Sequence, residues 1–227
     1  MKTSKHLFRL NRGHFFQNDA FRSHGTTAKN ELRYSATLKW VNSIVIKEKL
    51  CPFAPPVRQA SKLRVSLSNA SSHDDIIRDI AVEAHLLVGD QPRSHIDNDS
   101  PPPETTLVVL DDDACSSLKN FHDLVRLSWR VQEEAINKHG YTKHLQLVLF
   151  HPKATHDTYT EQDGEDAADY TIRSPFPVIH LLREVDVMDA VTSGYKDLEG
   201  LPSRNKARMR QRGIEKCAAK LEACHKL

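Results

Sequence analysis

The chain has 227 residues and a formal net charge of +2, with 39% hydrophobic and 27% charged residues. This composition is typical of a globular protein, and the length is sufficient for one domain with its own core. No run of eighteen apolar residues occurs, which argues against a membrane-spanning segment. The sequence also lacks the glycine spacing of a dinucleotide or Walker loop, the Gly-x-Ser-x-Gly elbow and the common zinc motifs.

The small net charge conceals two basic ends. Residues 1–33 carry seven basic and two acidic groups, and residues 204–227 carry eight basic and two acidic groups. The middle, residues 34–203, carries 17 basic and 26 acidic groups. We therefore expect an acidic domain between two basic segments.

Residues 1–34 are interpreted as a targeting leader. The segment is basic and poor in acids, and it lacks the continuous apolar stretch of a secretory signal. Arg33-Tyr34-Ser35 resembles a matrix-processing pattern in which arginine lies two residues before the cut. The sequence therefore predicts the mitochondrial matrix, with a plastid, or the cytoplasm and a disordered basic tail, as alternatives. Four cysteines without a Cys-x-x-Cys motif indicate a reducing compartment.

Hydrophobic periodicity predicts alternating helices and strands. In chain order the predicted elements are a helix over 38–51, a strand over 64–68, a helix from its N-cap Ser72 to Gly89, a loop over 90–103, a strand over 105–110, a helix over 118–140 and a strand over 145–150. This order favours an α/β fold in a single domain, with a small, mostly parallel sheet of three or more strands and helices on its faces.

The last third of the chain predicts an acidic loop and two more helices. After the loop over 153–170, Ser174 is expected to cap a helix from Pro175 to Met188. A basic helix is expected from about Ser203, so the domain spans 35–213 and a basic helical tail spans 214–227. The basic side chains of this helix alternate and lack interleaved aromatic residues, which argues against nucleic-acid binding and favours a solvated helix or one that clasps the acidic core.

Several short motifs occur in a fixed order: Trp40-Val41, Leu50-Cys51-Pro52-Phe53-Ala54, Glu104-Thr105-Thr106-Leu107, Phe150-His151-Pro152, the segment Tyr170 to Pro177, the segment His180 to Glu184, and Leu201-Pro202-Ser203-Arg204-Asn205. From about Trp40 to Gly213 the chain resembles the family called domain of unknown function fourteen-fifteen. The resemblance implies one homogeneous domain and supplies no reaction. The leader, Ile172 and the basic tail depart from the family pattern, and the leader indicates an organelle-targeted eukaryotic member.

The predicted site lies beyond the carboxyl ends of the parallel strands, where such sheets bind ligands. His151 follows the strand 145–150 and is predicted to transfer protons, with a histidine that bonds its own loop as the alternative. Arg173 and Ser174 open the predicted helix, whose free N–H groups favour an anion. His180, Arg183 and Glu184 would share one face of that helix, where a surface salt bridge and a packed histidine form the alternative.

We therefore predict a domain that binds a small anionic metabolite, a phosphate or carboxylate, and that transfers protons if it is an enzyme. The predicted catalytic residues are His151 and His180, the predicted binding residues are Arg173, Ser174, Arg183, Arg204 and Asn205, and the supporting residues are Cys51, Glu104 and Glu184. The alternative is a non-catalytic interaction or assembly module that uses the basic C-terminal helix.

Three further assignments stay open at this stage. Cys51 is either a supporting thiol or a buried structural residue, because a helix C-terminus raises a thiol pKa. Glu104 precedes its strand, so it is structural, for example paired with Arg173, unless that strand runs antiparallel. A metal set of His151, His156 and a carboxylate, Glu161 or Asp163, matches no established spacing, so no metal is predicted. The sequence leaves the cofactor and the oligomeric state open.

Overall fold

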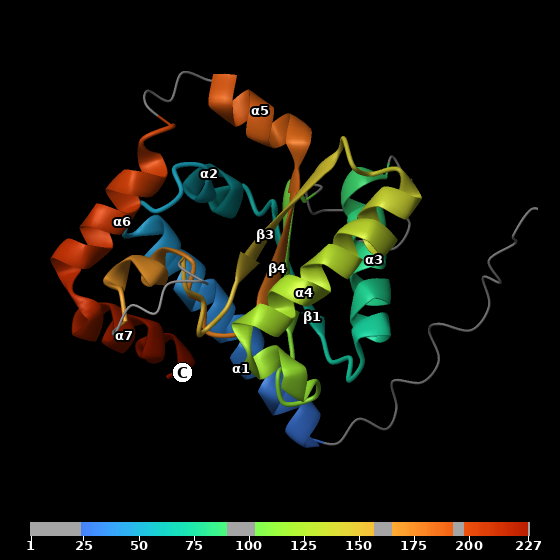
Figure 1. Cartoon of the computed structure of the whole chain (residues 1–227), viewed down its shortest axis with the longest axis horizontal. Coiled ribbons are helices and arrows are strands. Elements are labelled where there is room, and N and C mark those ends of the chain that lie inside the picture. The colour runs from blue at the N-terminus through green and yellow to red at the C-terminus, as the bar shows by residue number, and fades with distance from the viewer. Residues whose placement is uncertain (1–23, 90–102, 157–164, 193–197, 227) are drawn as a thin grey trace, which may run out of the picture.

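A four-stranded sheet with helices on both faces organises the chain (Figure 1). The computed structural model describes residues 24–89, 103–156, 165–192 and 198–226. The strands are β1 (Leu63–Ser68), β2 (Thr105–Leu110), β3 (Leu145–Phe150) and β4 (Val178–Arg183), in the order β1-β2-β4-β3. β1 and β2 are parallel, whereas β4 runs antiparallel to both β2 and β3. The α/β class is confirmed, but the sheet is mixed and not mostly parallel.

The prediction of a helix from Pro175 to Met188 is wrong. Residues 178–183 form β4, and a helix, α5 (Glu184–Thr192), begins only after the strand. A short apolar run fits either a buried helix or a strand, so periodicity alone does not separate them. Here β4 is paired along both edges, with β2 on one side and β3 on the other, and β-branched Val178 and Ile179 suit that position.

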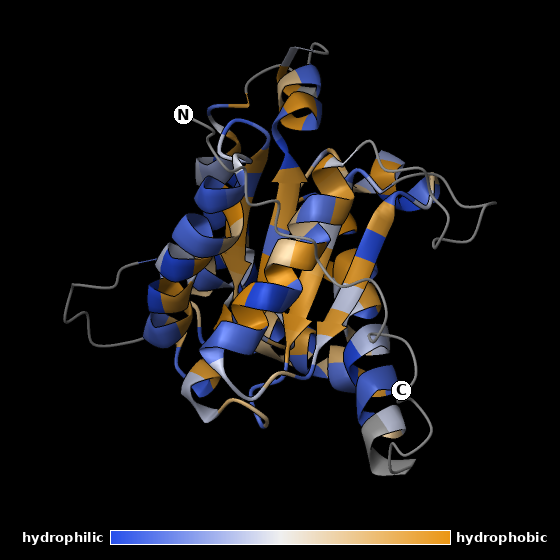
Figure 2. Cartoon of the chain, turned by 90° about the vertical axis from the view of Figure 1, so that its right-hand side faces the viewer, coloured by the Kyte–Doolittle hydropathy of each residue, from blue (hydrophilic) through white to orange (hydrophobic). Residues whose placement is uncertain are grey.

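The first face of the sheet is covered by α3 (His73–Val88) and α4 (Phe121–Val131), which Figure 1 places side by side. Their apolar sides pack on Val108, Leu110, Ile179 and Leu181 from the strands. Figure 2 shows the mostly hydrophobic strands behind these two helices, whose outer sides are largely hydrophilic. The predicted N-cap is confirmed, because the Ser72 hydroxyl accepts a hydrogen bond from the Asp75 backbone N–H at 3.2 Å.

Shorter helical segments connect these elements. They are the 3₁₀ turns Ser116–Lys119, Asn137–His139, Ala167–Thr171 and Ala223–His225 and the π-helical turns Val41–Ile46 and Gln132–Ile136. The predicted loop over 90–103 lies outside the described residues except for Pro103. Of the predicted loop over 153–170, residues 157–164, which include Glu161 and Asp163, lie outside them, and the end of this loop forms the 3₁₀ turn Ala167–Thr171.

The second face is covered by α1 (His24–Trp40), its π-helical continuation, α2 (Ala54–Gln59) and the C-terminal helices α6 (Leu201–Arg212) and α7 (Ile214–Glu222) (Figure 1). The chain is already helical over His24–Trp40, well before the predicted start at residue 38. The predicted C-terminal helix is broken at Gly213, where φ is +86°, a conformation that suits glycine.

The basic C-terminal helices clasp the rest of the domain. Buried Glu48 forms ion pairs with Arg212 and Lys220, and Arg210 pairs with Asp166 at 2.6 Å. The Asn205 side chain donates to the Leu50 carbonyl at 2.7 Å. These contacts agree with the expectation that the helix clasps the acidic core.

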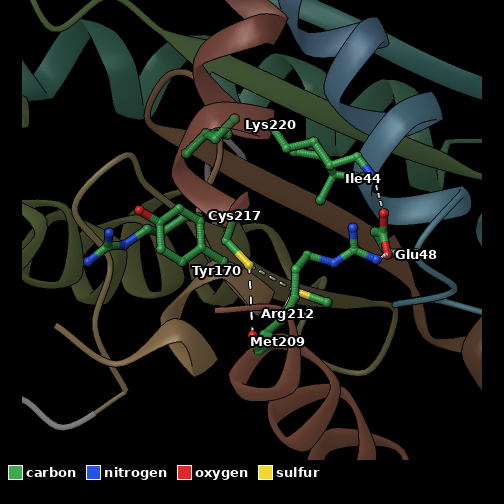
Figure 3. Close-up of a pocket in the computed structure, with 9 residues that line it drawn as sticks. Ile44, Glu48, Tyr170, Met209, Arg212, Cys217 and Lys220 are labelled. Carbon is green, nitrogen blue, oxygen red and sulfur yellow. Dashed lines mark hydrogen bonds and ion pairs between the residues drawn. The ribbon is translucent and has the colours of Figure 1, made fainter. Parts of the chain in front are cut away.

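A small cavity lies beneath these ion pairs (Figure 3). It is lined by Glu48, Arg212, Lys220 and the apolar or sulfur side chains around them, and its volume is about 10 Å³. That volume holds at most about one water molecule. The cavity is therefore a small gap in the packing of the C-terminal helices against the rest of the domain, and not a ligand site.

Candidate functional site

A large pocket opens on the second face of the sheet, where the helices leave part of the strands uncovered. Its volume is about 610 Å³, within the range of about 300–1,000 Å³ that is usual for small-molecule sites. Most of its wall is apolar, formed by Trp40, Val41, Val45, Phe53, Ala54, Pro56, Val57, Leu63, Leu107, Val148, Phe150, Leu182 and Val187. We call it the sheet-face pocket.

The sheet-face pocket has one apolar end and one polar end. Phe150 closes β3, and its ring lies 5.0 Å from that of Trp40 in an edge-to-face arrangement. The polar end lies at the opposite end of the strands, where β2 begins and β4 ends. There Leu182 of β4 pairs with Thr105 of β2 on one side and with Gln146 of β3 on the other. The other polar lining residues, Glu104, Asp186 and Asp189, precede β2 or follow β4.

His180 lies in the middle of the strand wall, opposite Leu107 on β2 and Val148 on β3. Its neighbour Thr105 fixes the ring tautomer. The Thr105 hydroxyl lies 2.8 Å from the Leu181 carbonyl and 2.5 Å from His180 Nε2, and both contacts are hydrogen bonds when it donates to the carbonyl and accepts from Nε2, so we assign this arrangement. Nε2 therefore carries the proton, and Nδ1 presents a lone pair. Among the described residues, none forms a hydrogen bond with Nδ1.

The His180 ring is neutral at physiological pH. Burial lowers the pKa of His180 to about 4, because the apolar wall disfavours the charged imidazolium. The ring is partly accessible from the pocket, yet it is enclosed by groups such as Phe150, whose ring centroid lies 6.1 Å away. The site thus offers a neutral hydrogen-bond acceptor in apolar surroundings.

This pKa predicts a pH dependence of stability. The folded pKa of about 4 lies below the unfolded value of about 6.5, so the unfolded chain binds more protons between these values. The stabilisation is complete above about pH 6.5 and is lost as the pH falls towards about 4. We expect the free energy of unfolding to fall between pH 7 and pH 5 by about 1–2 kcal/mol more in the wild type than in His180→Phe, as measured by urea denaturation. Equal losses in the two proteins would contradict the assignment.

Adjacent threonines on β2 give a matched test of the Thr105 hydrogen bonds. Thr105→Val leaves the His180 Nε2–H without its acceptor, so we expect a loss of about 1–3 kcal/mol in the free energy of unfolding. Thr106 is fully buried, and its hydroxyl has no partner among the described residues. Thr106→Val should therefore be neutral or stabilising. Urea denaturation of both variants tests the contrast, and equal losses would count against it.

Two of the predicted supporting residues, Cys51 and Glu104, line the sheet-face pocket with His180. Burial raises the pKa of the Cys51 thiol, although hydrogen bonds with the backbone of Phe53 and Ala54 oppose this. Glu104 forms an ion pair with Lys62, and its backbone N–H donates to the Lys62 carbonyl at 2.9 Å. The strand that follows Glu104, β2, is parallel to β1 and not antiparallel. The histidine that lines the same pocket as Glu104 is His180, which lies on the antiparallel strand β4.

His151 lies outside this pocket and is 1% exposed. Its Nε2 donates to the Leu118 carbonyl at 2.8 Å, and its Nδ1 accepts from the Lys153 backbone N–H at 2.9 Å. Burial lowers the pKa of His151. Both ring nitrogens are therefore engaged in holding the polypeptide around the end of β3.

The predicted anion site at Arg173 and Ser174 is not formed, because no helix begins at Pro175. The Arg173 guanidinium is buried, donates to the Ala154 carbonyl at 3.1 Å and lies 4.6 Å from the Tyr170 ring centroid. The Ser174 hydroxyl donates to the Phe176 carbonyl at 2.6 Å. These side chains connect loops of the fold.

The remaining predicted binding residues are dispersed. Arg183 forms a two-bond ion pair with Asp186, at 2.5 and 3.0 Å, and Glu184 accepts from Gln146 at 2.5 Å, both near the polar end of the sheet-face pocket. Arg204 is exposed on α6. Its neighbour Asn205 is buried and donates its side-chain N–H to the Leu50 carbonyl. The structure therefore does not bring the predicted anion-binding set together.

Sequence reasoning overlooked several residues of the pocket. Thr105 lies in the motif Glu104-Thr105-Thr106-Leu107, and a hydroxyl in an otherwise apolar strand indicates that it has a hydrogen-bond partner. Gln146, Asp186 and Asp189 carried no comparable signal, because their neighbourhood depends on the placement of β4. Within the described ranges, no group of three or more His, Cys, Asp or Glu side chains could hold a metal ion.

The comparisons with known proteins point to one family. The model described as "Protein of unknown function (DUF1415)" matches residues 33–219. No curated protein and no solved structure matches the chain. None of the helices in the described part of the chain is long and apolar enough to cross a membrane.

Proposed function

The chain belongs to the DUF1415 family, and we propose that its domain binds a small, mostly apolar molecule in the sheet-face pocket. The observation that carries the proposal is a pocket of about 610 Å³ with apolar walls and one neutral histidine acceptor. Apolar walls supply affinity through the hydrophobic effect, and a few placed polar groups orient the ligand.

Within this proposal, His180 is the histidine able to accept a hydrogen bond from a bound molecule. Its Nδ1 is unengaged among the described residues, whereas both nitrogens of His151 are engaged. The alternative, an interaction module that uses the basic C-terminal helices, has less support. Arg210, Arg212 and Lys220 already form ion pairs within the chain.

Filling the pocket should abolish ligand binding. Val148 lies on β3 and lines the pocket, so Val148→Trp would occupy part of the space without reaching the other face of the sheet. A neutral solvatochromic naphthalene dye, 6-propionyl-2-(dimethylamino)naphthalene, reports an apolar site by a blue shift of its fluorescence. We expect saturable binding to the wild type and binding at least about tenfold weaker to the variant.

Val82→Trp is the matched control, because Val82 is 59% exposed on α3, on the opposite side of the sheet. It should bind the dye as the wild type does. Urea denaturation establishes that both variants are folded. Undiminished binding to Val148→Trp would place the dye elsewhere and would contradict the proposal.

A further inference from the structure

We infer that the sheet-face pocket selects an apolar molecule carrying a hydrogen-bond donor, a hydroxyl or an amine, over one carrying a carboxylate or phosphate. The basis is the juxtaposition of an acceptor-only histidine nitrogen with a polar end at which the charged lining residues that the structure describes are all acidic. The inference rests on the proposed function and defines the chemical class of its ligand.

The first support is the hydrogen-bond chain through Thr105. With the ring proton on Nδ1, the Thr105 hydroxyl would have to donate to Nε2 and would lose its bond to the Leu181 carbonyl, whereas the Nε2–H tautomer keeps both bonds. Nδ1 is then a hydrogen-bond acceptor on a residue that lines the pocket. A ligand hydroxyl or amine can donate to it, whereas a carboxylate or an ether offers only lone pairs.

The second support is the charge of the lining. Among the described residues that line the pocket, the charged ones are Glu104, Asp186 and Asp189, and none is Lys or Arg. Glu104 and Asp186 are neutralised from outside the pocket by Lys62 and Arg183. Asp189 is exposed and has no cationic partner among the described residues. A bound anion would lose water without gaining a counter-ion, which is costly.

The third support is the direction of the polarity along the strands. Phe150 and Trp40 form the apolar end, His180 lies in the middle, and Gln146 and Glu104 lie towards the polar end. The body of an aromatic or alkyl ligand fits the apolar end. A hydroxyl or amine on such a ligand then lies towards His180 and the polar end of the pocket.

Four matched naphthalenes test the inference by calorimetry on the full chain: 2-naphthalenemethanol, its methyl ether, 2-naphthylmethylamine and 2-naphthoate. The alcohol and the amine should bind about five- to tenfold tighter than the ether, since one hydrogen bond is worth about this factor. The carboxylate should bind no better than the ether. In His180→Phe the alcohol and the ether should bind equally, and the apolar contribution should remain.

A nitrogen NMR spectrum of the histidine rings gives an independent measurement. In the free protein, Nδ1 of His180 should have the shift of an unprotonated ring nitrogen, and the alcohol, but not the ether, should move it. Binding of alcohol and ether with equal affinity to the wild type, or tightest binding of the naphthoate, would overturn the inference and leave the pocket proposal intact. If none of the four probes binds, both proposals fail.

Discussion

Replacing Arg33 by methionine should lower the free energy of unfolding by about 3–5 kcal/mol, because it removes one partner of a buried ion pair. Arg33 is 1% exposed, and its guanidinium donates to the Ser68 and Val109 carbonyls at 2.8 and 2.7 Å and to the Asn69 side chain at 2.6 Å. It also lies 3.6 Å from the buried Asp111 carboxylate. The substitution leaves these acceptors without their donor at the junction of α1, β1 and β2.

Arg126→Met is the matched control for this substitution. Arg126 is 74% exposed, and its partner within the described part of the chain is Asp123, one turn away on α4. Such surface pairs contribute little, so we expect a change within about 0.5 kcal/mol. Urea denaturation measures both variants. A loss for Arg33→Met no larger than that for Arg126→Met would show that the buried contacts of Arg33 do not hold α1 on the sheet.

The contacts of Arg33 also bear on the predicted leader. Cleavage after Tyr34 would remove Arg33 and much of α1, and with them Lys29, which pairs with Asp111 at 2.7 Å. A chain that starts at residue 24 keeps these contacts. Loss of residues 1–34 would therefore remove contacts that join α1 to β1 and β2.

Replacing Glu48 by glutamine should lower the free energy of unfolding by about 2–4 kcal/mol. Glu48 is 7% exposed, and its carboxylate forms ion pairs with Arg212 and Lys220 beside the small cavity shown in Figure 3. The neutral amide leaves two cations without their counter-ion. Because both cations are about a third exposed or less, water compensates only part of the loss.

Asp166→Asn is the matched control for Glu48→Gln. Asp166 also pairs with a C-terminal arginine, Arg210, but that arginine is 58% exposed. We expect a loss below about 1 kcal/mol. Limited proteolysis adds a local measurement, because Glu48→Gln should expose the α6 and α7 segment first. Equal effects of the two substitutions would mean that burial of the Glu48 charge is unimportant for the clasp.

Local sequence patterns were enough to predict most of the elements. The strands over 64–68, 105–110 and 145–150 and the helix capped by Ser72 are confirmed within one residue or so of their predicted starts. In each case the side chains that decide the element are neighbours in sequence. Capping, alternation and β-branched runs act over a few residues, so they can be recognised without the fold.

Local sequence does not determine whether Val178–Arg183 forms a helix or a strand. The residues Val-Ile-His-Leu-Leu-Arg fit a helix or a strand, and pairing with β2 and β3, which are distant in sequence, decides for the strand. The helix prediction placed His180 beside Arg183 on one helix face and Arg173 at its N-terminus. As a strand, β4 instead turns His180 towards the sheet-face pocket, and Arg173 becomes part of a loop core.

The sequence by itself determined the family, the α/β class, the segregation of charge to the two ends, and a set of motifs that contains Cys51, Glu104, Thr105 and His180. Only the tertiary structure decided which of these residues share a site. The physical reason is that strand order and register are long-range properties, set by which faces can be buried together. The same holds for the basic C-terminal residues, since pairing with Glu48 and Asp166 depends on where α6 and α7 pack.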